Sequence, residues 1–188
     1  MDYEEEQELV AQAKTDPEAF GELYRRYVKK IYNYHYHHTS SVSDAEDLTS
    51  QTFYRALRSL PGYRPTGAPF QAWLFRIAHN LVVNWYRDRK NERLVPLEIG
   101  LWAQIAPQVG SPESHLSTTE LHESLVRVID ALPEDRKTLI ILKFVEHMSN
   151  AEIAAVMGRT EGAIKALYHR TLISLRAAFH QGARVEDV

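Results

Sequence analysis

The 188-residue chain contains no cysteine. This absence excludes disulfide bonds and every zinc site that needs thiolate ligands, and it is typical of proteins in a reducing compartment. Long hydrophobic runs are also missing, because the densest apolar run is only Leu139 to Leu142 and the N-terminus is acidic. We therefore expect no signal peptide, no membrane-spanning segment and a cytoplasmic location.

The net charge of −3 is small, but acidic and basic segments alternate strongly along the chain. Residues 1–54 hold 5 basic and 11 acidic side chains (5 − 11 = −6), and residues 55–93 hold 8 and 2 (+6). Residues 94–135 hold 1 and 7 (−6), and residues 136–180 hold 7 and 3 (+4). Two basic blocks that could each meet phosphate are thus separated by acidic ones.

The second basic block contains a predicted helix-turn-helix over 149–176. Ser149 and Glu152 form a capping box, and Gly158 supplies the left-handed residue that ends the first helix. Thr160 caps the second helix, whose packing face combines Ile164, Leu167, Tyr168, Thr171 and Leu175. Its opposite face is small and basic, with Gly162, Ala166 and His169 flanked by Lys165, Arg170 and Arg176. Such a face suits the major groove of DNA, although any amphipathic helical hairpin gives a similar pattern.

The N-terminal part predicts a short helix over 4–14 and a longer one from Asp16-Pro17 to about His38. Apolar residues at helical spacing form the expected buried stripe of the longer helix: Phe20, Leu23, Tyr24, Tyr27 and Ile31. His35, His37 and His38 invite a metal-site interpretation. Without a nearby carboxylate before Asp44, we instead expect them on a partly exposed helix end.

A further helix is predicted from a capping box of Ser43 and Glu46, with Ala45, Leu48, Thr52 and Ala56 facing inward. Its opposite face carries a polar stripe at i, i+4, i+7 and i+11, formed by Asp47, Gln51, Tyr54 and Arg58. Such a stripe is either a solvated face or a protein-docking face.

The proline-rich stretch 61–69 predicts a loop, and a strong helix begins at Phe70. Its apolar stripe combines Phe70, Trp73, Leu74, Ile77, Leu81 and Trp85, and its outward stripe is mostly basic: Arg76, Asn80, Val83, Arg87 and Lys90. Trp85 and Tyr86 beside Arg87 and Arg89 could also stack unpaired bases, as in single-strand binding.

Residues 94–118 have three prolines, two glycines and no sustained period, which predicts a linker. Beyond it, 120–131 is amphipathic, Pro133 begins another helix with Leu139, Leu142 and Phe144, and the helix-turn-helix follows. The expected fold is all-α, with a first helical domain over 1–93, an extended linker over 94–118 and a second helical domain over 119–188.

Three motifs in this order resemble the extracytoplasmic-function (ECF, group 4) sigma factors, the minimal branch of the bacterial sigma-70 family. DAEDLTSQTF (44–53) is similar to the family's polymerase-docking motif, and FQAWLFRIAHN (70–80) to its promoter-melting helix. LPEDRKTLIILKF together with SNAEIAAVMGRTEGAIKALYHR resembles its C-terminal domain. The likeness covers essentially the whole chain.

The resemblance implies a non-enzymatic transcription initiation factor without cofactor or small-molecule substrate. Core RNA polymerase would bind Asp44, Asp47, Gln51, Tyr54 and Arg58. The single-stranded −10 element would face Arg76, Asn80, Asn84, Arg87 and Lys90, and the loop from Gly62 to Pro69 would capture a flipped-out base. The double-stranded −35 element would face Thr160, Lys165, Ala166, His169 and Arg170. An anti-sigma factor is the further partner implied, and it would hold the protein at the inner face of the membrane.

The chain departs from the family pattern at Asn84, where aspartate is common, and at Asp88, which interrupts a basic run. Leu167 and Leu172 replace frequent arginines. These departures bear on the strength and sequence of the promoter contacts.

Two other functions remain open from the residues alone. A dimeric helix-turn-helix regulator would bind duplex DNA without polymerase, but it leaves the polar stripe and the linker unexplained. A helical metal-dependent enzyme would use the histidines from His35 to His38, yet no nucleophile with a base and no phosphate-binding loop stands out.

Overall fold

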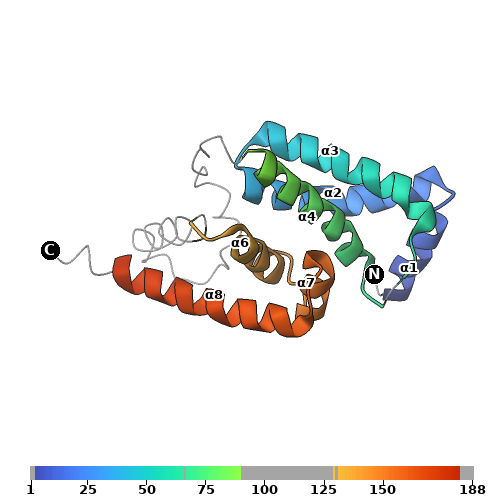
Figure 1. Cartoon of the computed structure of the whole chain (residues 1–188). Coiled ribbons are helices and arrows are strands. Elements are labelled where there is room, and N and C mark those ends of the chain that lie inside the picture. Colours follow the sequence, from blue (N-terminus) through green and yellow to red (C-terminus); the bar gives the residue numbers. More distant parts are fainter. Residues whose placement is uncertain (1–2, 66, 90–128, 130, 183–188) are drawn as a thin grey trace, which may run out of the picture.

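The computed structural model describes residues 3–65, 67–89, 129 and 131–182, and every regular element within these ranges is a helix. Two units follow one another along the chain (Figure 1). The N-terminal unit comprises α1 (Tyr3–Gln12), α2 (Pro17–Thr39), α3 (Val42–Ser59), the 3-10 turn η1 (Leu60–Gly62) and α4 (Phe70–Asp88). The C-terminal unit comprises α6 (Glu134–Ile140), the π-helical turn η4 (Ile141–Val145), α7 (Asn150–Met157) and α8 (Glu161–Gly182). The predicted all-α class is confirmed.

Helix α2 begins where the sequence predicts. The Asp16 side chain accepts a hydrogen bond from the Glu18 amide at 2.9 Å, and Pro17 occupies the first turn, where no amide is needed. Leu23, Tyr27 and Ile31 are buried as expected, whereas Tyr24 is 43% exposed beside Phe53 of α3. The helix ends at Ser40, whose φ of 53° is left-handed.

Helix α3 begins two residues earlier than predicted, so the Ser43–Glu46 capping box is wrong. The cap is Ser41, whose side chain accepts from the Asp44 amide at 3.3 Å, and the Ser41 amide in turn donates to the Thr39 hydroxyl. This tight turn between α2 and α3 fixes the start of the helix. The four inward positions of α3 are buried as predicted: Ala45, Leu48, Thr52 and Ala56.

Helix α4 has a broader buried surface than the sequence stripe suggests. Phe70, Leu74 and Leu81 are buried as predicted, and a second buried side combines Ala72, Phe75, Ala78, Val82 and Tyr86. Helix α4 contacts α1, α2 and α3 and also packs against α7 of the C-terminal unit. Sequence periodicity shows one apolar stripe, but a helix that is packed between two layers needs an apolar surface on both sides.

The helix-turn-helix forms as predicted. The Ser149 amide donates to the Glu152 carboxylate at 2.7 Å and the Glu152 amide donates to the Ser149 hydroxyl at 3.2 Å. Gly158 ends α7 with φ 64°, and the Ala163 amide donates to the Thr160 hydroxyl at 3.2 Å to cap α8. The helix expected after Pro133 widens into the π-helical turn η4, which leaves Phe144 48% exposed.

The last turn of α2 is fully buried, so the prediction of a partly exposed histidine end is wrong. His35, His37 and His38 are at most 2% exposed. His35 Nε2 lies 2.9 Å from the Thr52 hydroxyl of α3, and His38 Nε2 lies 3.5 Å from the Thr138 hydroxyl of α6. Contacts between residues 100 positions apart cannot be read from local periodicity.

Across the described ranges, none of the helices is long and apolar enough to span a membrane. Lys90, the proposed linker over 94–118 and residues 119–128 lie outside the described residues.

Candidate functional site

The outward stripe of α3 is accessible along its length. Asp47, Tyr54 and Arg58 are exposed and Gln51 is half-buried. Two internal contacts order the stripe: the Gln51 amide donates to the Asp47 carboxylate at 2.8 Å, and the Arg58 guanidinium donates to the Tyr54 hydroxyl at 3.4 Å. Neither contact uses the protein core. Tyr54 leaves 61% of its surface in solvent, and the Arg58 guanidinium lies 5.8 Å from its ring centre.

Asp44, at the N-terminal end of the same helix, occupies a different environment. Its carboxylate pairs with both terminal nitrogens of Arg89, at 2.9 and 3.0 Å, and only 22% of its side chain is exposed. A two-point pair of this kind ties the start of α3 to the end of α4. The pair makes Asp44 a structural link between the helix that carries the stripe and the helix beside it.

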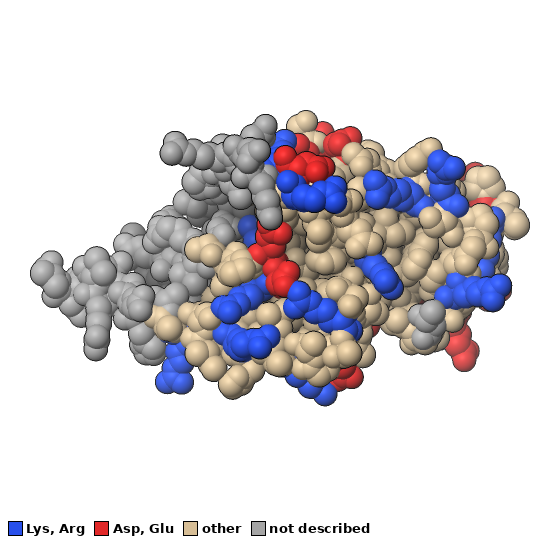
Figure 2. Space-filling model, in the orientation of Figure 1, with Lys and Arg blue, Asp and Glu red and all other residues tan. Residues whose placement is uncertain are grey.

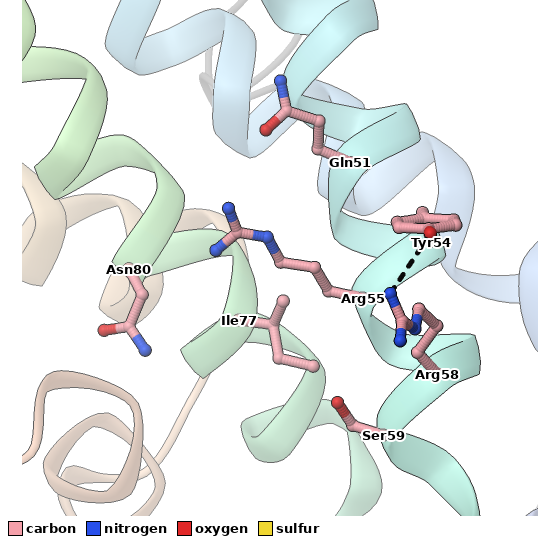
Figure 3. A pocket seen from close by; sticks show the side chains of 7 residues that line it. All are labelled: Gln51, Tyr54, Arg55, Arg58, Ser59, Ile77 and Asn80. Atoms are coloured by element: carbon pink, nitrogen blue, oxygen red, sulfur yellow. Dashed lines mark hydrogen bonds between the residues drawn. The ribbon is translucent and has the colours of Figure 1, made fainter.

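A groove of about 750 Å³ runs between α3 and α4 (Figure 3). Gln51, Tyr54 and Arg58 of the α3 stripe line one wall, and Ile77 and Asn80 of α4 line the other. Arg55 also lines the groove and reaches from α3 towards α4. The groove therefore brings together residues that the sequence assigns to two different partners, polymerase and DNA.

Arg55 is the main side chain of this groove that sequence reasoning missed. It is exposed and follows Gln51 by four residues, so it lies one turn along the same face. Extending the polar stripe by this i, i+4 relation would have included it. Together with Arg58, it gives the groove two guanidinium groups, and none of the described residues that line the groove is acidic.

The basic face of α4 is open to solvent. Arg76, Asn80, Val83 and Arg87 are exposed and Asn84 is half-buried, so five of the predicted positions share one accessible side. Arg87 pairs with the neighbouring Asp88 at 3.3 Å, and both side chains are more than two-thirds exposed, so this pair holds Arg87 weakly. Lys90 lies outside the described residues.

The aromatic pair at the end of α4 does not form a free stacking platform. Tyr86 is 9% exposed and donates a 3.0 Å hydrogen bond to the carbonyl of His38, so it belongs to the core. Trp85 is half-buried and covered by the Arg89 guanidinium, 4.8 Å from its ring centre. The predicted base stacking on these two rings is therefore wrong for this conformation.

The second helix of the helix-turn-helix separates its two faces as predicted. Ile164, Leu167 and Thr171 are buried, whereas the opposite positions are all exposed: Gly162, Lys165, Ala166, His169, Arg170 and Arg176. Lys165 forms a 2.8 Å pair with Glu161 one turn earlier, an exposed pair that a phosphate could displace. The buried Leu167 explains its departure from a basic residue, since it packs into the core of the C-terminal unit.

The distribution of charged side chains on the molecular surface fits several separate contact faces better than a single face. Figure 2 shows Lys and Arg side chains spread over the visible face of both units, with Asp and Glu side chains gathered in a few places between them. No group of three His, Asp or Glu side chains suited to a metal ion occurs in the described part of the chain.

Comparison with known proteins gives two family matches. The model described as Sigma-70 region 2 matches residues 23–92, and the model described as Sigma-70, region 4 matches residues 122–175. The first covers the α3 stripe, the groove and the α4 face, and the second covers the helix-turn-helix.

Two individual relatives are named as ECF RNA polymerase sigma factors. The ECF RNA polymerase sigma factor BldN of Streptomyces coelicolor is 35% identical over 178 residues, which are 94% of this chain and 67% of BldN. The ECF RNA polymerase sigma factor SigW of Bacillus subtilis is 29% identical over 169 residues, 87% of this chain and 90% of SigW. Among solved structures, CnrH in complex with the cytosolic domain of CnrY aligns with a TM-score of 0.67 and 25% identity, covering 94% of this chain and 97% of CnrH.

Proposed function

The chain belongs to the ECF group of the sigma-70 family and is an RNA polymerase sigma factor, and from this premise we propose how its surfaces divide the work. Its partners are core RNA polymerase and promoter DNA. We assign polymerase docking to the α3 stripe, the −10 element to the exposed face of α4, and the −35 element to the exposed face of α8. We propose that the chain acts by binding and positioning its partners and not as an enzyme.

The docking assignment is carried by one observation: a polar face of α3 remains open although the opposite face is the core. The hydrogen bonds given for Asp47, Tyr54 and Arg58 stay within the stripe and do not reach the core. An exposed ring next to two charges of opposite sign gives a surface that can recognise a protein partner by shape and charge. Asp44 enters this assignment as the residue that orients α3 through Arg89.

The DNA assignments follow from the charge of the side chains on the exposed faces of α4 and α8. On α4, Arg87 can neutralise a phosphate, while the Arg76 guanidinium and the amides of Asn80 and Asn84 can bind base edges. On α8, Lys165 and Arg170 flank a surface of small side chains that allows close approach to the groove, and Ala166 and His169 lie at its centre. Thr160 caps the helix whose N-terminal turn enters the groove. We assign residues 1–93 and 119–188 to the two domains, and 94–118 to the linker between them.

The two DNA assignments are tested by pairing protein and promoter changes. Run-off transcription with core polymerase would compare Arg76→Ala and Lys165→Ala on promoters altered in either element. A lost base contact costs about 1 to 3 kcal/mol, and it removes the preference for one base in one element only. Arg25→Ala, an arginine of α2 whose side chain is 65% exposed and paired with Glu22, is the matched control.

We expect Arg76→Ala to become insensitive to a change in the −10 element and Lys165→Ala to a change in the −35 element. Arg25→Ala should behave as the unaltered protein. Equal responses of both variants to both elements would contradict the division of labour between α4 and α8.

We further infer that an anti-sigma factor binds this chain. CnrH, which aligns over nearly its whole length, was solved with a second protein bound, the cytosolic domain of CnrY. A membrane-anchored partner of that kind would hold this chain at the inner face of the membrane. A candidate partner should form a stoichiometric complex with the purified chain and stop its transcription, and excess core polymerase should compete with it.

A further inference from the structure

The interface between the two units is built around the buried end of α2. Thr138 of α6 places its hydroxyl 3.5 Å from His38 Nε2 and also within hydrogen-bonding reach of Tyr34. Thr138, Tyr34 and His38 are each at most 2% exposed. Helix α7 packs against α4 beside them, so the C-terminal unit covers the face formed by α2 and α4 (Figure 1).

The groups that face His38 are neutral or basic. On α2 they are Tyr34, His35 and His37; on α4, Tyr86 and His79; on α6, Lys137. The pKa of His38 lies well below its ordinary value because the ring is fully buried and because Lys137 and the neighbouring histidines oppose a second positive charge. A proton on His38 would therefore meet repulsion from Lys137 across the interface, and among the described residues none of the groups that act on His38 is a carboxylate.

Two carboxylates lie elsewhere in the interface. Burial lowers the pKa of His79. Asp135 faces this histidine and partly offsets the effect of burial, whereas Arg159 lowers the pKa further. Glu146 of the C-terminal unit is 9% exposed, and burial raises its pKa to about 7 despite the attraction of Lys30 on α2. Glu146 thus responds to acid in the opposite sense to the histidines.

We propose that the histidine cluster at the end of α2 is a proton-sensitive latch, which holds the C-terminal unit on the N-terminal unit near neutral pH and releases it on acidification. Separation of the units would expose His37, His38 and His79 to water. His35 would stay covered by Thr52 of α3, within the N-terminal unit.

The direction of the effect follows from proton binding. Burial, reinforced by Lys137, lowers the pKa of His37 to about 4, below the ordinary value of about 6.5 that it would regain in water. Below about pH 6.5 the open form therefore binds more protons at His37 and His38 than the closed form, and acid favours opening. Glu146 gives up one proton on opening between about pH 7 and 4.5, which offsets one histidine.

His37 and His38 together take up two protons on opening and Glu146 releases one. His79 takes up part of a further proton, so the net uptake is one to two protons for each opening event. Each proton makes the ratio of open to closed molecules rise by up to about tenfold per pH unit. Removing the opposing carboxylate with Glu146→Gln should steepen this dependence by up to a further factor of about ten per pH unit.

The consequence for promoter binding rests on the proposed function. Helix axes pack about 8–10 Å apart, so the stack of α4, α7 and α8 keeps the axes of the two DNA-binding helices about 20 Å apart where they approach most closely. The −10 and −35 elements lie about 25 base pairs apart, or roughly 85 Å along straight DNA. A closed molecule can reach one element but not both, so opening the latch is a step towards initiation.

The experiment measures the separation of the units in the free, full-length protein, and it does not depend on transcription. Because the chain has no cysteine, dyes can be attached at two introduced cysteines, Ser50→Cys on α3 and Ile173→Cys on α8, both at exposed positions. Single-molecule energy transfer is recorded from pH 8 to pH 5.5, and circular dichroism in the same buffers reports whether the helices remain folded.

We expect one high-transfer state at pH 7.5 and a growing low-transfer state below about pH 6.5, with helicity retained. His38→Gln should stay closed at pH 5.5, and His147→Asn, at an exposed position outside the proposed binding faces, should behave as the parent. Constant transfer across the range, loss of helicity in step with transfer, or an unchanged response in His38→Gln would each overturn the latch. If His38→Gln does not fold, Glu146→Gln decides, because an unsteepened response would overturn it as well.

Discussion

At the scale of single residues, the proposed docking of polymerase on the α3 stripe can be tested at the exposed carboxylate of Asp47. Asp47→Arg should leave the free energy of unfolding within about 0.5 kcal/mol of the parent, since the side chain is exposed and accepts its hydrogen bond from Gln51 on the same helix. At an interface it reverses a charge, and like charges brought together there cost several kcal/mol. We therefore expect a normal melting curve and loss of core polymerase in a pull-down.

A matched control for this change lies on α1. Glu8 is exposed and accepts a hydrogen bond from Gln12 four residues later, at 3.4 Å, which is the same arrangement that links Asp47 and Gln51. Glu8→Arg should melt normally and still retain polymerase. Equal retention of polymerase by both variants would remove the docking role from the α3 stripe.

A second residue-scale prediction concerns His35, whose pKa burial lowers to about 3. The unfolded chain takes up a proton at about pH 6.5, so the folded state keeps its full stability above that pH and loses it as the pH falls towards 3. The cost is about 1.4 kcal/mol per pH unit for this one histidine.

His35→Gln should therefore be less stable at pH 7.5, because the packing changes, but less sensitive to acid. Chemical unfolding at pH 7.5 and pH 5.5 measures both quantities. The exposed His169→Gln serves as the control, and an identical acid response in His35→Gln and the parent would show that His35 does not stay neutral in the fold.

At the scale of elements, the start of α3 gives a paired test of helix capping. Ser41→Ala removes the hydroxyl that accepts from the Asp44 amide, and loss of such a cap costs about 1 kcal/mol. Ser43→Ala lies inside the helix on an exposed position, where alanine is the better helix former, so stability should be unchanged or slightly higher. Thermal melting of the two variants distinguishes them, and a larger loss in Ser43→Ala would place the cap where the sequence pattern put it.

The elements also show what the sequence can and cannot predict. The two faces of α8, the caps at Asp16 and Ser149 and the exposed stripe of α3 follow from local spacing, because each depends on residues within one or two turns. The burial of His38 depends on Thr138 and that of Tyr86 on the end of α2, so neither appears in any local pattern. The Ser41 cap was missed because Ser43 with Glu46 has the same spacing as a capping box.

The candidate site shows the same division between features that follow from local spacing and features that depend on long-range contacts. The exposure of Asp47, Arg76 and Lys165 could be predicted from periodicity, and their roles remain proposals. The pairing of Asp44 with Arg89 and the groove shared by Arg55 and Asn80 arise between helices. Long-range pairs of this kind need the packed structure.

At the scale of the whole molecule, the composition of residues 94–118 predicts where a protease acts first. Prolines and glycines without a helical period give a backbone that proteases accept readily. Limited proteolysis should cut between Leu94 and Thr118 and leave two helical fragments. Because the units pack through Thr138 and His38, the fragments should elute together at pH 7.5. Early cleavage within 44–60 would instead show that the domain boundary is misplaced.

The central claim for the whole molecule is that it directs core polymerase to a promoter. Run-off transcription on a promoter library tests this most directly, with the chain alone, core polymerase alone, and both together. We predict promoter-specific transcripts only from the combination, and none when Asp47→Arg replaces the parent chain. Specific protection of a palindromic site by the chain alone, with no promoter-specific transcripts when core polymerase is added, would contradict it and favour a dimeric helix-turn-helix regulator.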